Sequence, residues 1–148
     1  MNIVESAEEL QSKGLTLSEA AQADLKVLDA AVAEILDRSA DAFRRADAQA
    51  AAAVEPLEQV VDLLKEQLRT RHILRMREGK CSIEAGFVWA DLLTDLERTS
   101  DHCSNIAVAM IELESDAFDT HEYLKSVKDM KSDSFARYYE EYSKKFAL

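Results

Sequence analysis

Residues 89–113 read WADLLTDLERTSDHCSNIAVAMIEL, and this stretch decides the fold class. Its apolar and small side chains recur at alternating steps of three and four residues, which places them on one side of an α-helix. The positions in this series are Trp89, Leu92, Leu96, Thr99, Cys103, Ile106, Met110 and Leu113. We therefore expect a long helix, capped by Ser82, that packs the whole series against other helices.

Two more long helices are predicted upstream of this stretch. Thr16 and Glu19 form a capping box, and an apolar series with the same spacing follows over about 30 residues. That series contains Ala21, Leu25, Leu28, Val32, Ile35, Ser39, Ala42 and Ala46. The second helix is expected over Val54–Glu78, with Pro56 in its first turn and Gly79 as its stop. Three such helices with short connections predict an all-α fold, an elongated up-down-up three-helix bundle.

Both ends of the chain are expected to carry shorter helical pieces. Residues 2–12 read as the end of a helix without a start of its own, and residues 2–4 (Asn-Ile-Val) echo residues 105–107 (Asn-Ile-Ala). In the tail, Asp119 and Glu122 form a capping box for a short helix that lies on the bundle. Its contacts would come from the aromatic side chains Tyr138, Tyr139, Tyr142 and Phe146. The predicted organisation is 1–14 as the end of a preceding repeat, 15–116 as the bundle and 117–148 as a C-terminal helical segment packed on it.

Charge and composition exclude several classes of protein. The formal net charge of −11 repels phosphate backbones, so nucleic acid is not an expected partner. No run approaches the ~18 apolar residues that cross a bilayer, so we expect no membrane insertion of this chain. The early acids also argue against a signal peptide. Cys81 and Cys103 are too few for a disulfide framework and indicate a reducing compartment, so a soluble cytosolic protein is expected.

Three pairs of carboxylates stand four residues apart within the predicted helices. The pairs are Glu58 with Asp62, Asp91 with Asp95, and Glu97 with Asp101. Side chains at this spacing lie one turn apart on one face, so each pair can present two oxygens to one cation. The alternative is a solvated acidic face, which is common in a chain this acidic.

The predicted third helix has its polar residues in an organised pattern. Asp91, Asp95, Arg98 and His102 share a narrow arc opposite the apolar series, and Glu97, Asp101 and Asn105 lie beside it. Either Arg98 or a metal ion would offset the repulsion between these acids. Di-iron enzymes need a glutamate three residues before a histidine, and no histidine here has one, so we expect no catalytic activity.

A basic cluster closes the predicted second helix. Its candidates for an anion site or a partner contact are Arg69, Arg71, Arg75 and Arg77. Positive charge in the last turn of a helix also complements the helix dipole, which is the alternative explanation.

The run from Asp95 to Ala107, Asp-Leu-Glu-Arg-Thr-Ser-Asp-His-Cys-Ser-Asn-Ile-Ala, resembles the signature of the PhoU family. Residues 72–73, 79–84, 86–87 and 118–124 resemble the version found at the C-terminus of sodium/phosphate cotransporter family proteins. The resemblance covers most of the chain from Thr16 onward. It implies a three-helix repeat that usually occurs as two copies, of which this chain would hold the second.

The resemblance also carries expectations about function. Acidic motifs on the second and third helices of the family are associated with surface metal clusters of iron or zinc, and Glu58/Asp62 and Glu97/Asp101 match those motifs here. Carboxylate ligands alone would favour magnesium, calcium or manganese. The implied function is regulation of phosphate uptake from the cytoplasmic face, with the membrane domain of a sodium/phosphate cotransporter as partner. A homodimer is a further expected assembly. The alternatives are a free-standing metal-binding phosphate-signalling regulator and a helical scaffold without a ligand.

Overall fold

The computed structural model describes the backbone of residues 2–117 and 121–148, and the side chains of residues 2–114 and 133–148. Over these residues the regular secondary structure is helical, without a strand, which confirms the all-α prediction. The helices are α1 (Ile3–Ser12), α2 (Glu19–Arg45), α3 (Ala48–Ala51), α4 (Val54–Arg77), α5 (Ile83–Ala117) and α6 (His121–Lys145).

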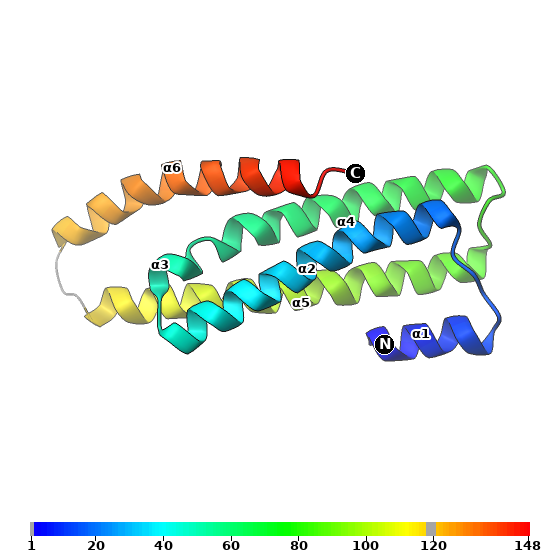
Figure 1. Ribbon diagram of the computed structural model, residues 1–148, viewed down its shortest axis with the longest axis horizontal. Helices are drawn as coiled ribbons and strands as arrows, with labels where there is room; N and C mark the ends of the chain where they lie inside the picture. Colours follow the sequence, from blue (N-terminus) through cyan, green and yellow to red (C-terminus); the bar gives the residue numbers. More distant parts are fainter. Residues whose placement is uncertain (1, 118–120) are drawn as a thin grey trace.

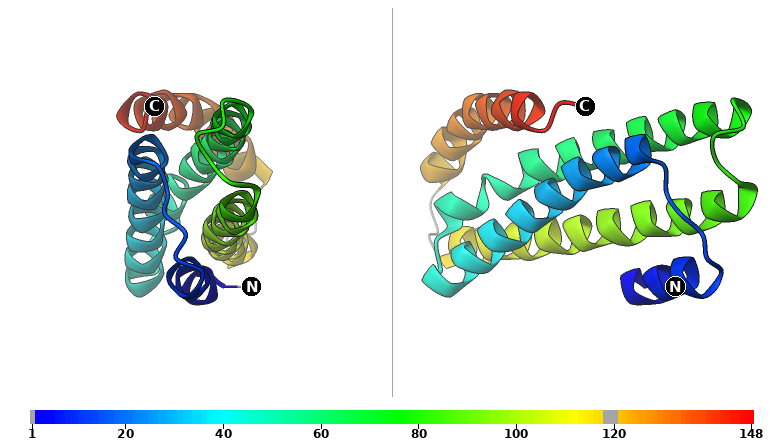
Figure 2. Two further views of the ribbon diagram at one scale, coloured as in Figure 1. Left: turned by 90° about the vertical axis from the view of Figure 1, so that its right-hand side faces the viewer. Right: turned by 45° about the vertical axis from the view of Figure 1, so that its right-hand side comes forward.

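Helices α2, α4 and α5 run up, down and up beside one another and form the elongated bundle (Figure 1). The short helix α3 fills the turn between α2 and α4. Helix α6 lies along α4 on one side of the bundle, whereas α1 lies against α5 on the opposite side (Figure 2). The predicted up-down-up arrangement and the docking of the tail on the bundle are therefore confirmed.

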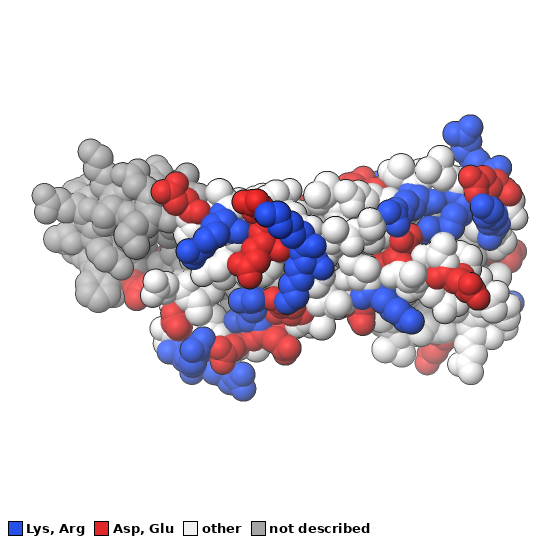
Figure 3. Space-filling model, turned by 45° about the horizontal axis from the view of Figure 1, so that its top comes forward, with Lys and Arg blue, Asp and Glu red and all other residues white. Residues whose placement is uncertain are grey.

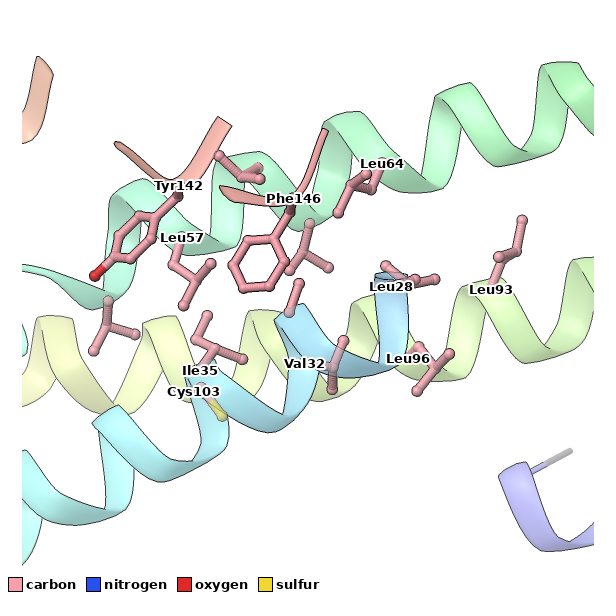
Figure 4. Packing of buried hydrophobic residues seen from close by; sticks show 14 of the residues in the cluster. Leu28, Val32, Ile35, Leu57, Leu64, Leu93, Leu96, Cys103, Tyr142 and Phe146 are labelled. Atoms are coloured by element: carbon pink, nitrogen blue, oxygen red, sulfur yellow. The ribbon is translucent and has the colours of Figure 1, made fainter. Parts of the chain in front are cut away.

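The core runs along the axis of the bundle and is built from the predicted apolar series. Buried leucine, isoleucine and valine side chains from α2 and α4 meet Trp89, Leu93, Leu96 and Cys103 of α5. Tyr142 of α6 and Phe146, which directly follows α6, close the core on the side of α4 (Figure 4). Each of these helices buries one face, so the stability of the bundle depends on mutual packing rather than on helix propensity alone.

The predicted start of α2 is wrong by two residues. Ser18, not Thr16, is the N-cap, and its Oγ accepts a hydrogen bond from the Ala21 N–H at 3.2 Å. Leu17 packs against the core from the non-helical segment before the cap. At the other end, Ala46 is the left-handed C-cap rather than a member of the apolar series. The predicted start of α4 and the Ser82 cap of α5 are confirmed.

The apolar series of α5 is correct at most of its positions, including Cys103 and Met110, and wrong at two positions in its second half. Trp89, Leu92 and Leu96 are buried as predicted, but Ile106 and Leu113 are exposed. Ala107 faces the core instead. A straight α-helix drifts by about 20° per heptad relative to a 3.5-residue repeat, so a series of three heptads rotates out of the interface by about 60°.

The two ends of the chain also differ from expectation. Helix α1 does have a start, because Asn2 Oδ1 accepts the Glu5 N–H at 3.0 Å and Glu5 Oε2 accepts the Asn2 N–H at 2.9 Å. Helix α6 is longer than the short helix predicted, at 25 residues. The capping box proposed at Asp119 and Glu122 lies outside the residues whose side chains are described.

Candidate functional site

Two of the three predicted carboxylate pairs face one another across the contact between α4 and α5. Glu58 and Asp62 lie on α4, and Glu97 and Asp101 lie on α5. The register is fixed by two contacts between the antiparallel helices: Lys65 Nζ lies 3.1 Å from Glu97 Oε2, and the Ser104 hydroxyl donates to the Glu55 carboxylate. These four acids and Glu55 are called the acidic cluster below.

The pKa values show how strongly the members of the acidic cluster interact. Burial raises the pKa of Glu58 to about 7, with further contributions from the negative charges of Asp62, Glu55, Asp101 and Glu97. Burial likewise raises the pKa of Asp62, with Glu97 as the next cause. Ionising a carboxyl group in this environment is unfavourable, and a nearby cation would make the ionised form more favourable. The acidic cluster is therefore a concentration of negative potential at the surface of the bundle.

The balancing cation within the chain is Lys65 rather than Arg98, which the sequence had suggested. Lys65 reaches across from α4 to Glu97, and both side chains are mostly buried. Arg98 is exposed, and no ion pair joins it to these acids in the part of the chain that the structure describes. Spacing along one helix identifies only neighbours on that helix, so the sequence pattern of α5 does not indicate a lysine from α4.

Asp91 and Asp95 do not join the acidic cluster. Neither is among the charges that act on Glu58 or Asp62, and one oxygen of Asp95 is buried without a hydrogen-bond partner. The predicted acidic arc of α5 is thus divided between two flanks, one facing α4 and one turned away from it. Among the residues that the structure describes, no group of three His, Cys, Asp or Glu side chains is placed to hold a metal ion.

Two of the four arginines of the basic cluster form ion pairs with a buried carboxylate of another helix. Arg71 Nη1 and Arg75 Nη1 lie 2.7 Å and 2.6 Å from the two carboxylate oxygens of Asp24 on α2, and Asp24 and Arg75 are buried. Arg75 also lies over the ring of Trp89, 5.4 Å from its centroid. Lysine and arginine side chains gather at this end of the molecule with acidic side chains between them (Figure 3). Arg69 and Arg77 remain exposed there.

Comparison with known proteins places the chain in a family. The model of the PhoU domain matches residues 26–110, which is more than half of the chain and includes the acidic cluster. The chain belongs to the PhoU domain family. It is 27% identical over 105 residues to the phosphate-specific transport system accessory protein PhoU homolog 1 of Thermotoga maritima. That alignment covers 71% of this chain and 45% of the relative, so the chain spans less than half of the relative's length. No solved structure matches the chain.

One contact in this PhoU domain was missed by the sequence analysis. The thiol of Cys81 lies 3.9 Å from Nδ1 and 3.8 Å from Nε2 of His72, nine residues away. The two distances are nearly equal, so the sulfur does not form a directed hydrogen bond with one ring nitrogen, as an activated thiol would. Burial, and then the charge of Arg75, lower the pKa of His72, and its ring stacks on Trp89. His72 is therefore a neutral core residue of the PhoU domain at pH 7.

Within the described residues, no helix of the PhoU domain combines the length and the apolar character needed to cross a bilayer. The contacts of Cys81 with His72 and of Asp24 with the arginines of α4 both join residues that are distant on any helical wheel. Of these two contacts, the sequence contains a signal only for that of Cys81 with His72, because Gly79 between them indicates a turn. In the structure Gly79 has a positive φ of 70°.

Proposed function

We propose that this PhoU domain regulates phosphate transport and is attached to a sodium-dependent phosphate transporter at the inner face of the plasma membrane. The observation that carries the proposal is the PhoU match over residues 26–110. The Thermotoga relative is named as an accessory protein of a phosphate-specific transport system, which supports a role in the same process. The likeness of residues 79–84 to cotransporter C-termini favours the attached form over a free-standing regulator. The role is regulatory rather than catalytic.

We also propose that the acidic cluster is where the domain responds to a divalent cation. Its carboxylate oxygens are of the donor type that magnesium, calcium and manganese prefer, whereas the family resemblance points to iron or zinc. Glu58, Asp62, Glu97 and Asp101 would hold the ion after their side chains rotate toward one another, since no three of them converge among the described residues. A bound cation would supply positive charge where the pKa of Glu58 is raised.

The regulatory role is tested in cells that carry the gene at its natural locus. Uptake of radiolabelled phosphate is measured at high external phosphate with the unchanged gene and with the Glu58→Gln/Glu97→Gln variant. We expect the variant to change the uptake rate at least twofold, and the matched Asp91→Asn variant to leave it unchanged. Equal uptake by cells with and without the domain would contradict any role in phosphate transport and leave the ligand-free scaffold.

The cation response is tested separately on the purified chain. Titration calorimetry with Mn²⁺, Mg²⁺ and Zn²⁺ should show binding that the Glu58→Gln/Glu97→Gln variant weakens at least tenfold, because two of the four carboxylates are lost. Asp91→Asn should bind like the unchanged chain. Absence of heat with all three metals would remove the cation from the proposal without affecting the uptake result.

A further inference from the structure

Three side chains with soft donor atoms gather where α4 turns back into α5, at the end of the bundle farthest from α3 (Figure 1). His72 and Met76 are four residues apart on α4, so they lie one turn apart on one face of that helix. Cys81 lies in the turn, and its sulfur is 3.8 Å from His72 Nε2. The three residues supply an imidazole, a thioether and a thiol, which are donor types that bind soft metal ions.

Gly86, near the start of α5, lies beside two of these donors. A β-carbon at this position would lie 3.0 Å from His72 Nε2 and 3.0 Å from the Met76 sulfur. The nitrogen and the sulfur are therefore no more than twice that distance apart, and the glycine places no side chain between them. The end of a methionine side chain is flexible, so its sulfur can move closer to the nitrogen.

The distance between Cys81 and His72 already suits a shared ion. With bond lengths like those of zinc, ~2.0 Å to nitrogen and ~2.3 Å to sulfur, two such ligands of one ion lie within about 4.3 Å of each other. The observed 3.8 Å between Cys81 Sγ and His72 Nε2 is inside this limit. Cys81 is only partly buried, so an ion can reach its sulfur from solvent.

The His72 ring is in the protonation state that a metal ion requires. It is 3% exposed, and because burial and the charge of Arg75 lower its pKa, the ring is neutral at pH 7. Among the described residues, the hydrogen-bonding partner of both ring nitrogens is the Cys81 sulfur. Buried polar atoms are normally better satisfied than this, and a bond from Nε2 to a metal ion would satisfy one of them. Stacking on Trp89 holds the ring in place.

We propose that His72, Met76 and Cys81 form a binding site for one Cu(I) ion. On binding, the S–H bond of Cys81 breaks, the proton passes to solvent and a copper–sulfur bond forms, while the oxidation state of copper stays the same. One positive charge enters as one proton leaves, so the site gains no net charge beside the buried Arg75. Thiolate and thioether ligands select Cu(I), whereas structural zinc takes four ligands without a thioether.

The test is a competition for Cu(I) between the full 148-residue chain and the coloured chelator bicinchoninate, in the absence of oxygen. The unchanged chain should take up one Cu(I) per molecule. Cys81→Ser and Met76→Leu should each weaken binding about tenfold or more, since even the loss of a group that only supports a ligand costs that much. The matched controls are Cys103→Ala and Met110→Leu, which remove a thiol and a thioether outside the proposed site and should bind like the unchanged chain.

Gly86→Ala distinguishes the proposed site from binding by the thiol alone. This variant keeps all three donors but places a methyl group at the point that lies 3.0 Å from both His72 Nε2 and the Met76 sulfur. It should therefore weaken Cu(I) binding about as much as Met76→Leu does. Alanine has the higher helix propensity, which favours retention of α5, and circular dichroism checks the helix content of every variant. As a second readout, Cu(I) should raise the melting temperature of the unchanged chain and leave that of Cys81→Ser nearly unaltered.

Several outcomes would overturn the proposal. One is a chain that takes no copper from bicinchoninate at any concentration. Another is Cu(I) binding that neither Met76→Leu nor Gly86→Ala weakens, which would show that the thiol binds copper without the other donors. The Glu58→Gln/Glu97→Gln variant should take up Cu(I) like the unchanged chain, because Asp62 and His72 are ten residues apart on α4, about 15 Å. Loss of copper in that variant would place the ion at the acidic cluster instead, so the two metal proposals are tested independently.

Discussion

Asp24 is a buried carboxylate that depends on two partners from another helix. Arg71 and Arg75 bind one oxygen each, and Arg75 is buried with Asp24. Asp24→Ala leaves the Arg75 guanidinium buried without its counter-charge, so we expect a loss of about 3–5 kcal/mol in the free energy of unfolding. Urea denaturation measures the change. Asp29→Ala, on the exposed face of the same helix, is the control, and an equal effect of both substitutions would contradict this account.

Glu58 should make stability depend on pH in the direction opposite to an ordinary salt-bridged acid. Its pKa is raised from 4.5 to about 7, so the folded chain holds this proton more tightly than the unfolded chain does. The free energy of unfolding should therefore fall as pH rises from about 4.5 through about 7. The part due to Glu58 is on the order of 1 kcal/mol once solvent screening is allowed for.

Substituting Glu58→Gln tests that dependence by removing the titrating group. The variant should be more stable than the unchanged chain at pH 8 and nearly equal to it at pH 5. Thermal melts at both pH values give the comparison, with Asp91→Asn as the control. A constant difference between Glu58→Gln and the unchanged chain at pH 5 and pH 8 would show that Glu58 does not titrate in this range.

Sequence reasoning at the residue scale succeeded where the partners are close in the chain. The spacing of Glu58 with Asp62, and of Glu97 with Asp101, follows directly from helix geometry. The partners of Asp24 lie 47 and 51 residues away, and nothing in the local pattern identifies them. That the two acid pairs meet is likewise a property of the α4–α5 register, which spacing along one helix does not determine.

At the scale of single elements, the start of α2 offers a clear choice between two caps. Ser18→Ala removes the hydroxyl that accepts the Ala21 N–H and should cost about 1 kcal/mol in the free energy of unfolding. Thr16→Ala should cost much less, because Thr16 lies outside the helix. Thermal denaturation of both variants is the measurement. A larger loss for Thr16→Ala would restore the capping box predicted from sequence.

The helices themselves could be predicted well, whereas the faces they bury could be predicted only in part. Gly79 and Ser82 punctuate the chain strongly enough to fix the end of α4 and the start of α5. Whether Ile106 is buried or exposed depends on how far the helices supercoil. The effect of supercoiling accumulates along a helix and is not determined by any one residue. The capping box of α1 was not predicted, because Asn2 and Glu5 are common polar residues whose side chains have many other possible partners.

At the scale of the whole molecule, the net charge of −11 acts against compactness. Raising NaCl from about 20 mM to about 150 mM should therefore raise the melting temperature by a few degrees, because the Debye length falls to about 8 Å. Calorimetry at several salt concentrations measures this. MgCl₂ at matched ionic strength is the comparison, and a greater stabilisation by Mg²⁺ would indicate binding rather than screening. A melting temperature that falls with NaCl would show that surface ion pairs dominate instead.

Helix α5 is unbroken over 35 residues, and it presents Glu97 and Asp101 on one flank and Ile106 and Leu113 on the other. A rigid rod that turns about its long axis must carry both flanks with it. Any ion that draws the carboxylates toward α4 would thereby tilt the leucine and isoleucine at the rod's far side. By thermodynamic reciprocity, the factor by which the ion changes the affinity of that flank for a binding partner is the same factor by which the partner changes the affinity for the ion.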